Sequence, residues 1–333
     1  SSLSAFDEMG GSSSTALCYY GFDVGGTKVE VAAFDSHLKL IEGTKQRWPV
    51  PEDYDALLAI VCDAVTALDA ELKCEGLVGL GVPGKCSEEG ILLAANVKAA
   101  HNKPFKTDLE RLLRRKVVVE NDANCFALSE ALDASLRACD NVLGIILGTG
   151  VGAGLVIRGH VVRGKNNFAG EVGHVPVSAA ALEHLGQGNT LATCGCGKRG
   201  CIDGFVSGRG FEKLFAQRDP GRRSLSAAEI VQLSSDGEPD AVAFVSWFTE
   251  LLGIVVAEWC TVFDPDVIVF GGGLSNASEV ISGLEACMRP RLLFGSTEPP
   301  GLALAKHGDS GGVRGAAFLN VTDEQLHYLR QLP

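Results

Sequence analysis

Three cysteines lie within one eight-residue stretch of the chain, at Cys194, Cys196 and Cys201, with glycines between them that let the backbone turn tightly. Three thiolates in one loop suit a tetrahedral Zn²⁺ ion, with one imidazole completing a closed structural site. Upstream, His174 and His184 could each supply that imidazole. Free thiols are the alternative, which the tight spacing disfavours. The spacing therefore predicts a structural zinc site.

Two glycine-rich turns could bind phosphate groups. Gly25-Gly26-Thr27 and Gly148-Thr149-Gly150-Val151-Gly152 each separate two short β-branched runs, and they lie about 120 residues apart, as in a duplicated chain. Backbone N–H groups in such turns form anion-binding concavities, to which Thr27 and Thr149 add hydroxyl donors. A third run, Gly271-Gly272-Gly273, lets the backbone approach a ligand closely. Ordinary tight turns are the alternative for each run.

Two other nucleotide-binding patterns fit the sequence poorly. Residues 79–86 come within one residue of a Walker A loop, but Cys86 replaces the magnesium-binding hydroxyl, and 88–90 follow where a helix should begin. Residues 148–153 fit a loose dinucleotide-binding pattern, but 154–157 continue as a strand, which leaves no helix N-terminus for a pyrophosphate. We therefore disfavour P-loop and Rossmann sites.

Asp122 lies where a strand is expected to meet a helix. Val117-Val118-Val119 is typical of a strand, and a helical pattern begins at Ala123. Active-site residues often project from such corners, where a carboxylate could serve as a general base. Capping the helix N-terminus is the other role open to Asp122.

The elements that position these residues mix strands with helices. Strands are expected at 19–24, 28–34, 141–147, 153–157 and 267–270, and helices at 55–72, 123–136 and 241–262. This mixture predicts an α/β protein, and the repeated strand, glycine turn and strand predict a duplicated one. With 333 residues the chain is long enough for two domains.

Composition limits the partners and the compartment. The net charge of −12, without a local basic patch, argues against nucleic acid and acidic membrane surfaces as partners. The 11 cysteines favour a reducing cytoplasm over a disulfide framework. No apolar run approaches the roughly 18 residues of a membrane-spanning helix, and the sequence shows no export signal. We expect residues 1–18 to be a flexible leader or a cloning remnant.

Five motifs, in this order along the chain, resemble those of the ROK family of sugar kinases. They are Asp23–Lys28, Gly148–Gly152, Glu171–His174, Cys194–Cys201 and Gly271–Asn276. The resemblance runs from Tyr19 to about Asp323 and implies an actin-like, ribonuclease-H-like duplicated fold, with two lobes around a cleft for ATP and sugar. It implies a small lobe of 19–136 with the return of 312–333, a large lobe of 137–311 carrying the zinc loop, and a homodimer.

The resemblance also implies an activity. Segments 120–130 and 306–318 are most similar to the branch that phosphorylates N-acetyl-D-glucosamine, so we expect ATP-dependent phosphorylation of its 6-hydroxyl, with Asp122 as the catalytic base. Glucose and N-acetylmannosamine are alternative substrates. A non-catalytic sugar-binding regulator and a sugar-responsive repressor are alternative functions, although about 18 residues before the first strand are too few for a helix-turn-helix module.

The same motifs imply roles for further residues. The sugar is expected to contact Asn96, Asn121, Asp122, Glu171, His174 and Asp203. ATP and Mg²⁺ are expected at Asp23, Gly25, Gly26, Thr27, Lys28, Thr149, Gly150, Gly272 and Gly273, with Asp23 holding the ion. The resemblance selects His174 to join the three cysteines at the zinc. Asp203 departs from the pattern, because the family usually has Glu there.

Overall fold

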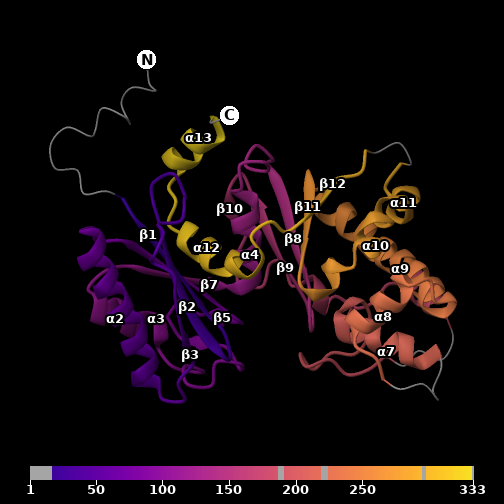
Figure 1. Cartoon of the computed structure of the whole chain (residues 1–333), viewed down its shortest axis with the longest axis horizontal. Coiled ribbons are helices and arrows are strands. Elements are labelled where there is room, and N and C mark those ends of the chain that lie inside the picture. The colour runs from indigo at the N-terminus through magenta and orange to yellow at the C-terminus, as the bar shows by residue number, and fades with distance from the viewer. Residues whose placement is uncertain (1–16, 187–190, 219–223, 295–297, 332–333) are drawn as a thin grey trace. The chain divides into compact units, whose positions relative to one another are not determined.

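The computed structural model of the chain describes residues 17–186, 191–218, 224–294 and 298–331 (Figure 1). These residues form two compact units. Unit 1 holds 17–129 together with 309–331, and unit 2 holds 130–308. Nearly all of the expected leader lies outside the described residues, and the lobe boundaries expected at 136 and 312 stay a prediction.

Unit 1 is built on a five-stranded sheet in the order β3-β2-β1-β4-β7. Strand β2 runs antiparallel to its neighbours β1 and β3, whereas β4 and β7 run parallel to β1. The strands of this unit are β1 (Tyr19–Val24), β2 (Lys28–Phe34), β3 (Gln46–Pro49), β4 (Leu77–Val82), β5 (Lys85–Cys86), β6 (Leu92–Leu93) and β7 (Val117–Asn121). Its helices are α2 (Tyr54–Leu72), α3 (Phe105–Leu113), α12 (Gly311–Phe318) and α13 (Asp323–Gln331), and α4 (Asp122–Ala131) leads into unit 2.

Alternate residues of β1 face opposite sides of the sheet. Tyr20 and Phe22 enter the core that α2 and α3 close. Gly21 faces α12, and a Cβ atom added there would lie 1.9 Å from the carbonyl oxygen of Val313. A Cβ on Gly79 of β4 would meet the backbone of α12 at the same distance. Helix α12 therefore packs directly on the strand backbones, where only glycine fits.

Unit 2 is built on a second five-stranded sheet, in the order β10-β9-β8-β11-β12. Its strands are β8 (Asn141–Leu147), β9 (Val151–Ile157), β10 (His160–Val161), β11 (Val267–Gly271) and β12 (Gly301–Leu304). Its α-helices are α5 (Ala179–Leu185), α6 (Asp203–Val206), α7 (Gly208–Arg218), α8 (Ala227–Ser235), α9 (Pro239–Phe263), α10 (Ser278–Ser282) and α11 (Leu284–Met288). Short 3-10 helices are η2 (Val172–His174), η3 (Gly273–Asn276), η4 (Arg289–Arg291) and η5 (Gly308–Ser310), the last of which leads back to unit 1.

The two sheets share one pattern of pairing. In each, three strands consecutive in the order are antiparallel, and two further strands are added in parallel beside the first strand of the unit. The hairpin β1–β2 corresponds to β8–β9, so the two glycine-rich turns occupy the same place in the two units. The predicted α/β class and duplicated organisation are confirmed.

Helix α9 differs from the expectation that no segment would be long and apolar enough to span a membrane. Its 25 residues, Pro239–Phe263, meet that test by length and composition. However, 67% of its most apolar window is buried inside the fold, where it packs against α8, α10 and α11. A core helix of a soluble domain has the same character, because it is apolar on most of its surface.

Helix α4 ends five residues earlier than the pattern at 123–136 predicts. Beyond Ala131 the chain forms a turn in which the side chain of Asp133 accepts hydrogen bonds from the backbone and hydroxyl of Ser135, at 3.0 and 2.7 Å. Aspartate and serine offer the backbone such alternatives to a helix. Their polar side chains therefore end a helix that the apolar pattern would continue.

Candidate functional site

The first glycine-rich turn follows β1 in unit 1. The N–H of Gly25 donates to the carbonyl of Lys28 at 2.9 Å, which closes the turn. A Cβ on Gly26 would lie 2.9 Å from the carbonyl oxygen of Asn96, so the segment carrying Asn96 lies directly against the turn. Thr27 accepts a backbone hydrogen bond from Val50 at 3.1 Å. The structure thus brings Asn96 together with the expected phosphate loop.

Asp23 lies on β1, just before this turn. Its carboxylate faces α12, where a Cβ on Gly312 would lie 3.1 Å from it. Burial raises the pKa of Asp23, and Glu30 adds to that rise, whereas Lys28 and Arg47 oppose it. A carboxylate in such a setting gains from a bound cation. Asp23 therefore fits the expected role of holding Mg²⁺, for which carboxylate oxygen and water are the usual ligands.

Three cations surround Glu30, which is only 2% exposed. Its carboxylate lies 3.1 Å from Lys28 Nζ, 2.9 Å from Lys45 Nζ and 3.8 Å from Arg47 Nε. Although burial opposes ionisation, the Lys45 and Lys28 ammonium groups lower the pKa of Glu30. Strand pairing places Asp23, Glu30 and Arg47 in one row across β1, β2 and β3.

Sequence reasoning named only Lys28 of these cations. Lys45 and Arg47 occupy alternate positions leading into β3, and Lys28 and Glu30 occupy alternate positions on β2. This period of two places each pair on one face of its strand. This alternation is visible in the sequence. Because β3 was not among the expected strands, however, nothing placed Lys45 and Arg47 beside Lys28 and Glu30.

Asp122 is the first residue of α4. The side-chain oxygen of Asn121 accepts from the backbone N–H groups of Ala123 and Asn124, at 2.9 and 3.4 Å, and its amide nitrogen donates to the Gly84 carbonyl at 3.0 Å. Asp122 Oδ1 also accepts from Ala123, at 2.8 Å. Asn121 therefore supplies the usual helix cap, and capping alone does not account for a carboxylate at Asp122.

The second glycine-rich turn follows β8 in unit 2. The N–H of Gly148 donates to the carbonyl of Gly150 at 3.0 Å, and the carbonyl of Gly148 accepts from Gly208 at 2.8 Å. Strand β9 begins at Val151, so the turn is two residues shorter than its motif. The N–H of Val151 donates to Oδ1 of Asp203 at 2.7 Å.

The third glycine run lies at the end of β11, beside this turn. Gly272 has a φ of +86°, and a Cβ there would lie 2.6 Å from the carbonyl group of Leu147, the residue before the second turn. Only glycine combines that backbone conformation with so close an approach. Gly273 starts η3, and among the described residues none beyond its chain neighbours has an atom within 4 Å of the position its Cβ would take. The structure therefore brings Gly272 and the second turn together within unit 2.

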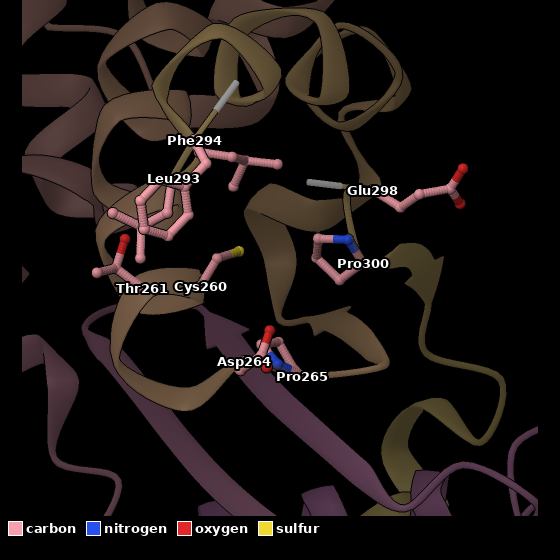
Figure 2. A pocket seen from close by; sticks show the side chains of 9 residues that line it. Cys260, Thr261, Asp264, Pro265, Leu293, Phe294, Glu298 and Pro300 are labelled. Atoms are coloured by element: carbon pink, nitrogen blue, oxygen red, sulfur yellow. The ribbon is translucent and has the colours of Figure 1, made fainter. Parts of the chain in front are cut away.

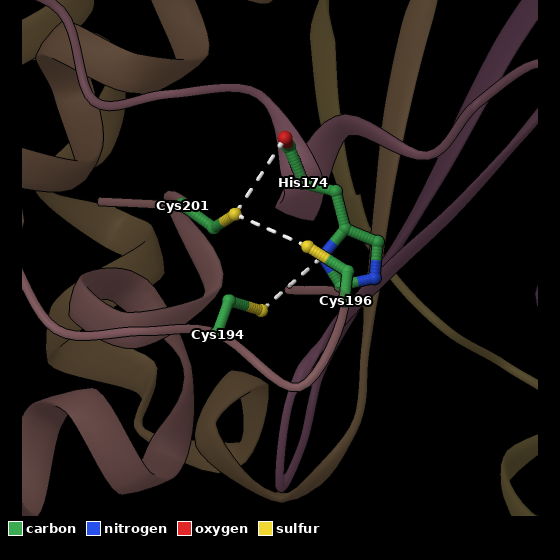
Figure 3. Close-up of side chains that lie close together, drawn as sticks. All are labelled: His174, Cys194, Cys196 and Cys201. Atoms are coloured by element: carbon green, nitrogen blue, oxygen red, sulfur yellow. Dashed lines mark hydrogen bonds between the residues drawn. The ribbon is translucent and has the colours of Figure 1, made fainter. Parts of the chain in front are cut away.

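The three cysteines of the zinc motif meet His174 (Figure 3). One ligand atom from each of the four residues lies within 4.8 Å of every other. His174 Nδ1 is 3.6 Å from Cys194 Sγ, and Cys196 Sγ is 3.6 Å from Cys201 Sγ. Three thiol sulfurs and one imidazole nitrogen at these separations match the closed tetrahedral set of a structural zinc site.

His184 does not join this cluster. Its Nε2 lies 2.9 Å from the carbonyl oxygen of Trp247, and its ring stacks on the Trp247 ring at 5.1 Å between centroids. The choice between His174 and His184, which spacing alone left open, is settled in favour of His174 as the cysteines' neighbour.

The thiols of the cysteine cluster differ in the direction of their pKa shifts. A backbone hydrogen bond from Lys198 lowers the pKa of Cys196, whereas burial and the neighbouring thiols raise the pKa of Cys201. Thiolates this close repel one another unless a cation balances them, and a metal deprotonates its thiol ligands. The donor set therefore fits Zn²⁺ in both geometry and charge.

Glu171 lies beside the same histidine. Its Oε2 is 3.8 Å from His174 Nε2, the ring nitrogen that does not face Cys194. Both side chains are partly exposed. Fixing Nδ1 at a metal would orient the ring and, through it, this carboxylate.

Two cavities in unit 2 differ in their relation to these residues. One, of about 230 Å³, is lined by Thr149 and Asp203, by Cys194 and Cys201 of the cysteine cluster, and by the cations Arg209 and Lys213, among others. The second, of about 290 Å³, lies between the end of α9 and residues 292–294, Glu298 and Pro300 (Figure 2). None of the residues expected to bind sugar, nucleotide or metal lines it. Only the first cavity belongs to the candidate site.

Comparison with known proteins gives one consistent family. The model of the ROK family matches residues 19–323. An N-acetyl-D-glucosamine kinase from Vibrio atlanticus (strain LGP32) is 47% identical over 305 residues, which cover 91% of this chain and 99% of that protein.

Two solved structures are also similar. A ROK hexokinase from Thermus thermophilus has a TM-score of 0.79 at 28% identity, covering 91% of this chain and 97% of that one. A ROK family glucokinase from Streptomyces griseus, in complex with glucose and AMPPNP, has a TM-score of 0.69 at 27% identity, covering 91% and 98%.

Proposed function

The chain belongs to the ROK family, and from this premise we propose that it phosphorylates the 6-hydroxyl of N-acetyl-D-glucosamine with ATP, giving N-acetylglucosamine 6-phosphate and ADP. It is an ATP-dependent sugar kinase. The observation that carries the choice of sugar is the likeness to N-acetyl-D-glucosamine kinases over nearly their whole length. The actin-like fold of the family, with its duplicated α/β units, agrees with this activity.

We assign the chemistry to Asp122. As the 6-hydroxyl oxygen attacks the γ-phosphorus, its proton passes to the Asp122 carboxylate, and the bond from the γ-phosphorus to the β–γ bridging oxygen breaks to release ADP. Two features support this role: Asp122 opens α4 after a strand, and Asn121 already caps that helix. A base at this place contributes about 10²- to 10⁴-fold to the rate.

The phosphates are assigned to the two glycine-rich turns. Gly25, Gly26 and Thr27 would serve in unit 1, and Thr149 and Gly150 in unit 2, with Gly272 and Gly273 toward the adenosine. Lys28 is held by the buried Glu30, which keeps its charge near the first turn. Asp23 would hold Mg²⁺ through water, and the bound ion would neutralise charge that develops on the phosphates.

The sugar is assigned to Asn96, Asn121, Glu171 and His174, in addition to Asp122. His174 would serve twice, with Nδ1 toward a zinc ion shared with Cys194, Cys196 and Cys201, and Nε2 on the side of Glu171. Four protein ligands leave the metal no open position. Its role is therefore structural: it orders the loop that orients these side chains. Asp203 is assigned to the sugar as well, and its Oδ1 also accepts the N–H of Val151 at 2.7 Å.

We further propose that the protein works in the cytoplasm as a homodimer. All eleven cysteines are free of disulfides in the structure, which agrees with a reducing compartment. Size-exclusion chromatography with light scattering would test the dimer, and a monomer at micromolar concentration would remove it.

A coupled assay of ADP release tests the activity across N-acetylglucosamine, glucose and N-acetylmannosamine. We expect N-acetylglucosamine to give the highest kcat/KM. The 6-deoxy analogue is the matched control, because it lacks only the attacking hydroxyl and should give no turnover. A higher kcat/KM for either other sugar would refute the substrate. Sugar binding without ATP turnover would identify a regulator instead.

A further inference from the structure

The buried carboxylate of Glu30, on β2, divides its two oxygens between different cations. Its Oε1 lies 2.9 Å from Lys45 Nζ, whereas its Oε2 lies 3.1 Å from Lys28 Nζ and 3.8 Å from Arg47 Nε. A carboxylate is rarely buried so completely unless cations compensate its charge. Glu30 therefore fixes the places of its cationic neighbours, just as they stabilise its ionised form.

The Oε2 oxygen serves the two cations that act on the first glycine-rich turn and its carboxylate. The carbonyl of Lys28 accepts the N–H of Gly25 at 2.9 Å, so the backbone of Lys28 closes the turn. Arg47 is paired with Glu30 across β2 and β3, and Glu30 is paired with Asp23 across β1 and β2. Both cations oppose the rise in the pKa of Asp23. Their charges therefore reach the carboxylate proposed to hold Mg²⁺.

The Oε1 oxygen is held from the other side by Lys45. The Nζ of Lys45 also donates to Oγ of Ser310 at 2.9 Å, and Ser310 directly precedes α12. The buried side chain of Thr44 fixes the backbone beside Lys45, because its Oγ1 accepts the N–H of Ala33 at 3.0 Å. Lys45 thus has a fixed partner on each side. It orients Oε1 and leaves Oε2 for the cations beside the turn.

The count of charges shows that Glu30 is not there to attract an anion. Lys28, Lys45 and Arg47 surround two carboxylates, Asp23 and Glu30, which leaves one positive charge in excess. An excess of positive charge attracts phosphate, and Glu30 reduces it. Without Glu30, however, the three cations would repel one another and turn toward solvent. Its contribution is therefore to the position of the cations.

We infer that Glu30 is a positioning residue for the nucleotide: it holds Lys28 and Arg47 toward the phosphate groups of ATP at the first turn. Lys45 and Ser310 keep the Glu30 carboxylate in the orientation that this requires. Lys45 thus acts through Glu30 and not by contact with the nucleotide. This inference rests on the proposed function, because it takes the first turn to bind ATP.

The test measures equilibrium binding of AMPPNP with Mg²⁺ by calorimetry. Glu30→Gln keeps the shape of the side chain and removes its charge. The change should weaken AMPPNP binding by about tenfold, because Lys28 and Arg47 lose their charged partner. Electrostatics without positioning predicts the opposite, since removing a carboxylate favours an anion. Tighter or unchanged binding would therefore overturn the inference.

A double-mutant cycle separates positioning from general damage. Lys28→Met alone should weaken AMPPNP binding by about tenfold. If Glu30 acts through its neighbours, adding Glu30→Gln to Lys28→Met should cost less than about threefold more, the remainder being due to Arg47. Losses that multiply in full would mean that Glu30 acts independently of Lys28, and would overturn the inference.

Asp69→Asn is the matched control in unit 1. Asp69, on α2, is paired with Arg115 and accepts the N–H of Gly76 at 3.1 Å, beside the end of the sheet where β1 begins and not where the turn lies. This variant should bind AMPPNP within about twofold of the parent. A loss as large as that of Glu30→Gln would show general damage to the unit and would overturn the inference.

A second variant provides the test if Glu30→Gln fails to fold. The Lys45 side chain is 47% exposed, so Lys45→Met should fold, and it should weaken AMPPNP binding by about two- to threefold. No loss there would contradict the role of Lys45. Binding of N-acetylglucosamine should change by less than about twofold in Glu30→Gln and Lys45→Met, and an equal loss of both ligands would overturn the inference. A parent protein that binds AMPPNP but not the sugar refutes the proposed function alone.

Discussion

The two glycine-rich turns occupy equivalent hairpins but have different surroundings. Around the first, charged side chains gather: Asp23, Glu30, Lys28 and Arg47 lie on three adjacent strands, and Lys45 lies just before the third. Around the second, the contacts are hydrogen bonds to the backbone of the turn, from a carboxylate and from the start of a helix. The duplicated fold thus places a glycine-rich turn at the same position in each unit. The neighbouring side chains differ, because charged groups gather near the first turn and hydrogen bonds fix the backbone of the second.

The first prediction removes the proposed catalytic base and leaves both glycine-rich turns intact. Asp122→Asn should lower kcat by at least about 100-fold, because the amide keeps the shape but cannot take the proton. Binding of the sugar should stay within about tenfold of the parent. Steady-state kinetics and calorimetry measure the two. A variant that keeps more than about a tenth of kcat would exclude Asp122 as the base.

The second prediction removes a charge beside the first turn. Asp23→Asn should lower kcat by about 10- to 100-fold and weaken the dependence on Mg²⁺. The same change should raise Tm at pH 7. Because burial raises the pKa of Asp23 in the folded state, its ionised form opposes folding as the pH rises through that pKa.

The effect of Asp23→Asn on Tm should depend on pH. The gain in Tm from Asp23→Asn should shrink as the pH falls and the parent aspartate becomes protonated, and calorimetric scans from pH 7 to pH 4 would follow it. A lower Tm at pH 7, or a gain that does not change with pH, would contradict the buried-charge account.

The third prediction disturbs the cysteine cluster that lines the same cavity as Thr149 of the second turn. Cys196→Ser should lower the bound zinc, reduce Tm by about 5 °C or more and reduce activity severalfold, since metal binding is coupled to folding. Elemental analysis and thermal unfolding measure the first two effects. Cys62→Ser, on α2 in unit 1, is the matched control and should keep its zinc. Unchanged zinc and stability in Cys196→Ser would remove the structural site.

The smallest effect is expected from an exposed charge near the first turn. Arg47→Met should raise KM for ATP by about two- to threefold at low salt and less at high salt, because exposed charges are screened. Arg289→Met, which removes a surface arginine paired with Glu285 in unit 2, is the control and should leave KM unchanged. If Arg47→Met instead raised KM for the sugar alone, the row of charges would not serve the nucleotide.

Strong local patterns could be read from the sequence. Strands β1, β2 and β8 begin and end where they were predicted, because runs of aromatic or β-branched residues there adjoin a glycine-rich turn. The Walker-like segment was correctly disfavoured: it ends in the two-residue strand β5, and a turn at 88–90 follows where a P-loop would begin its helix. The end of α4 was predicted five residues too late, because a pattern of apolar residues takes no account of the hydrogen bond that the Asp133 side chain accepts from the backbone.

Contacts between distant segments could not be read in the same way. The spacing of the cysteines predicted a cluster, but only packing decides that His184 stacks on Trp247 while His174 joins the cysteines. The bond from Val151 to Asp203 joins residues 52 apart, and nothing local to either residue signals it. The family pattern assigns Asp203 to the sugar but says nothing of this hydrogen bond, which only the packing of the two segments produces.

The packing of α12 on β1 has a consequence for synthesis of the chain on the ribosome. Gly21 and Gly79 are covered by a helix that is translated only after all of unit 2. At about 5–20 residues per second, translation of 130–308 takes roughly 10 to 40 s. During that interval the amino-terminal sheet is without its last layer, whereas unit 2 is continuous in sequence and can fold as soon as it emerges. Unit 1, although its synthesis begins first, is therefore the last unit to complete its fold.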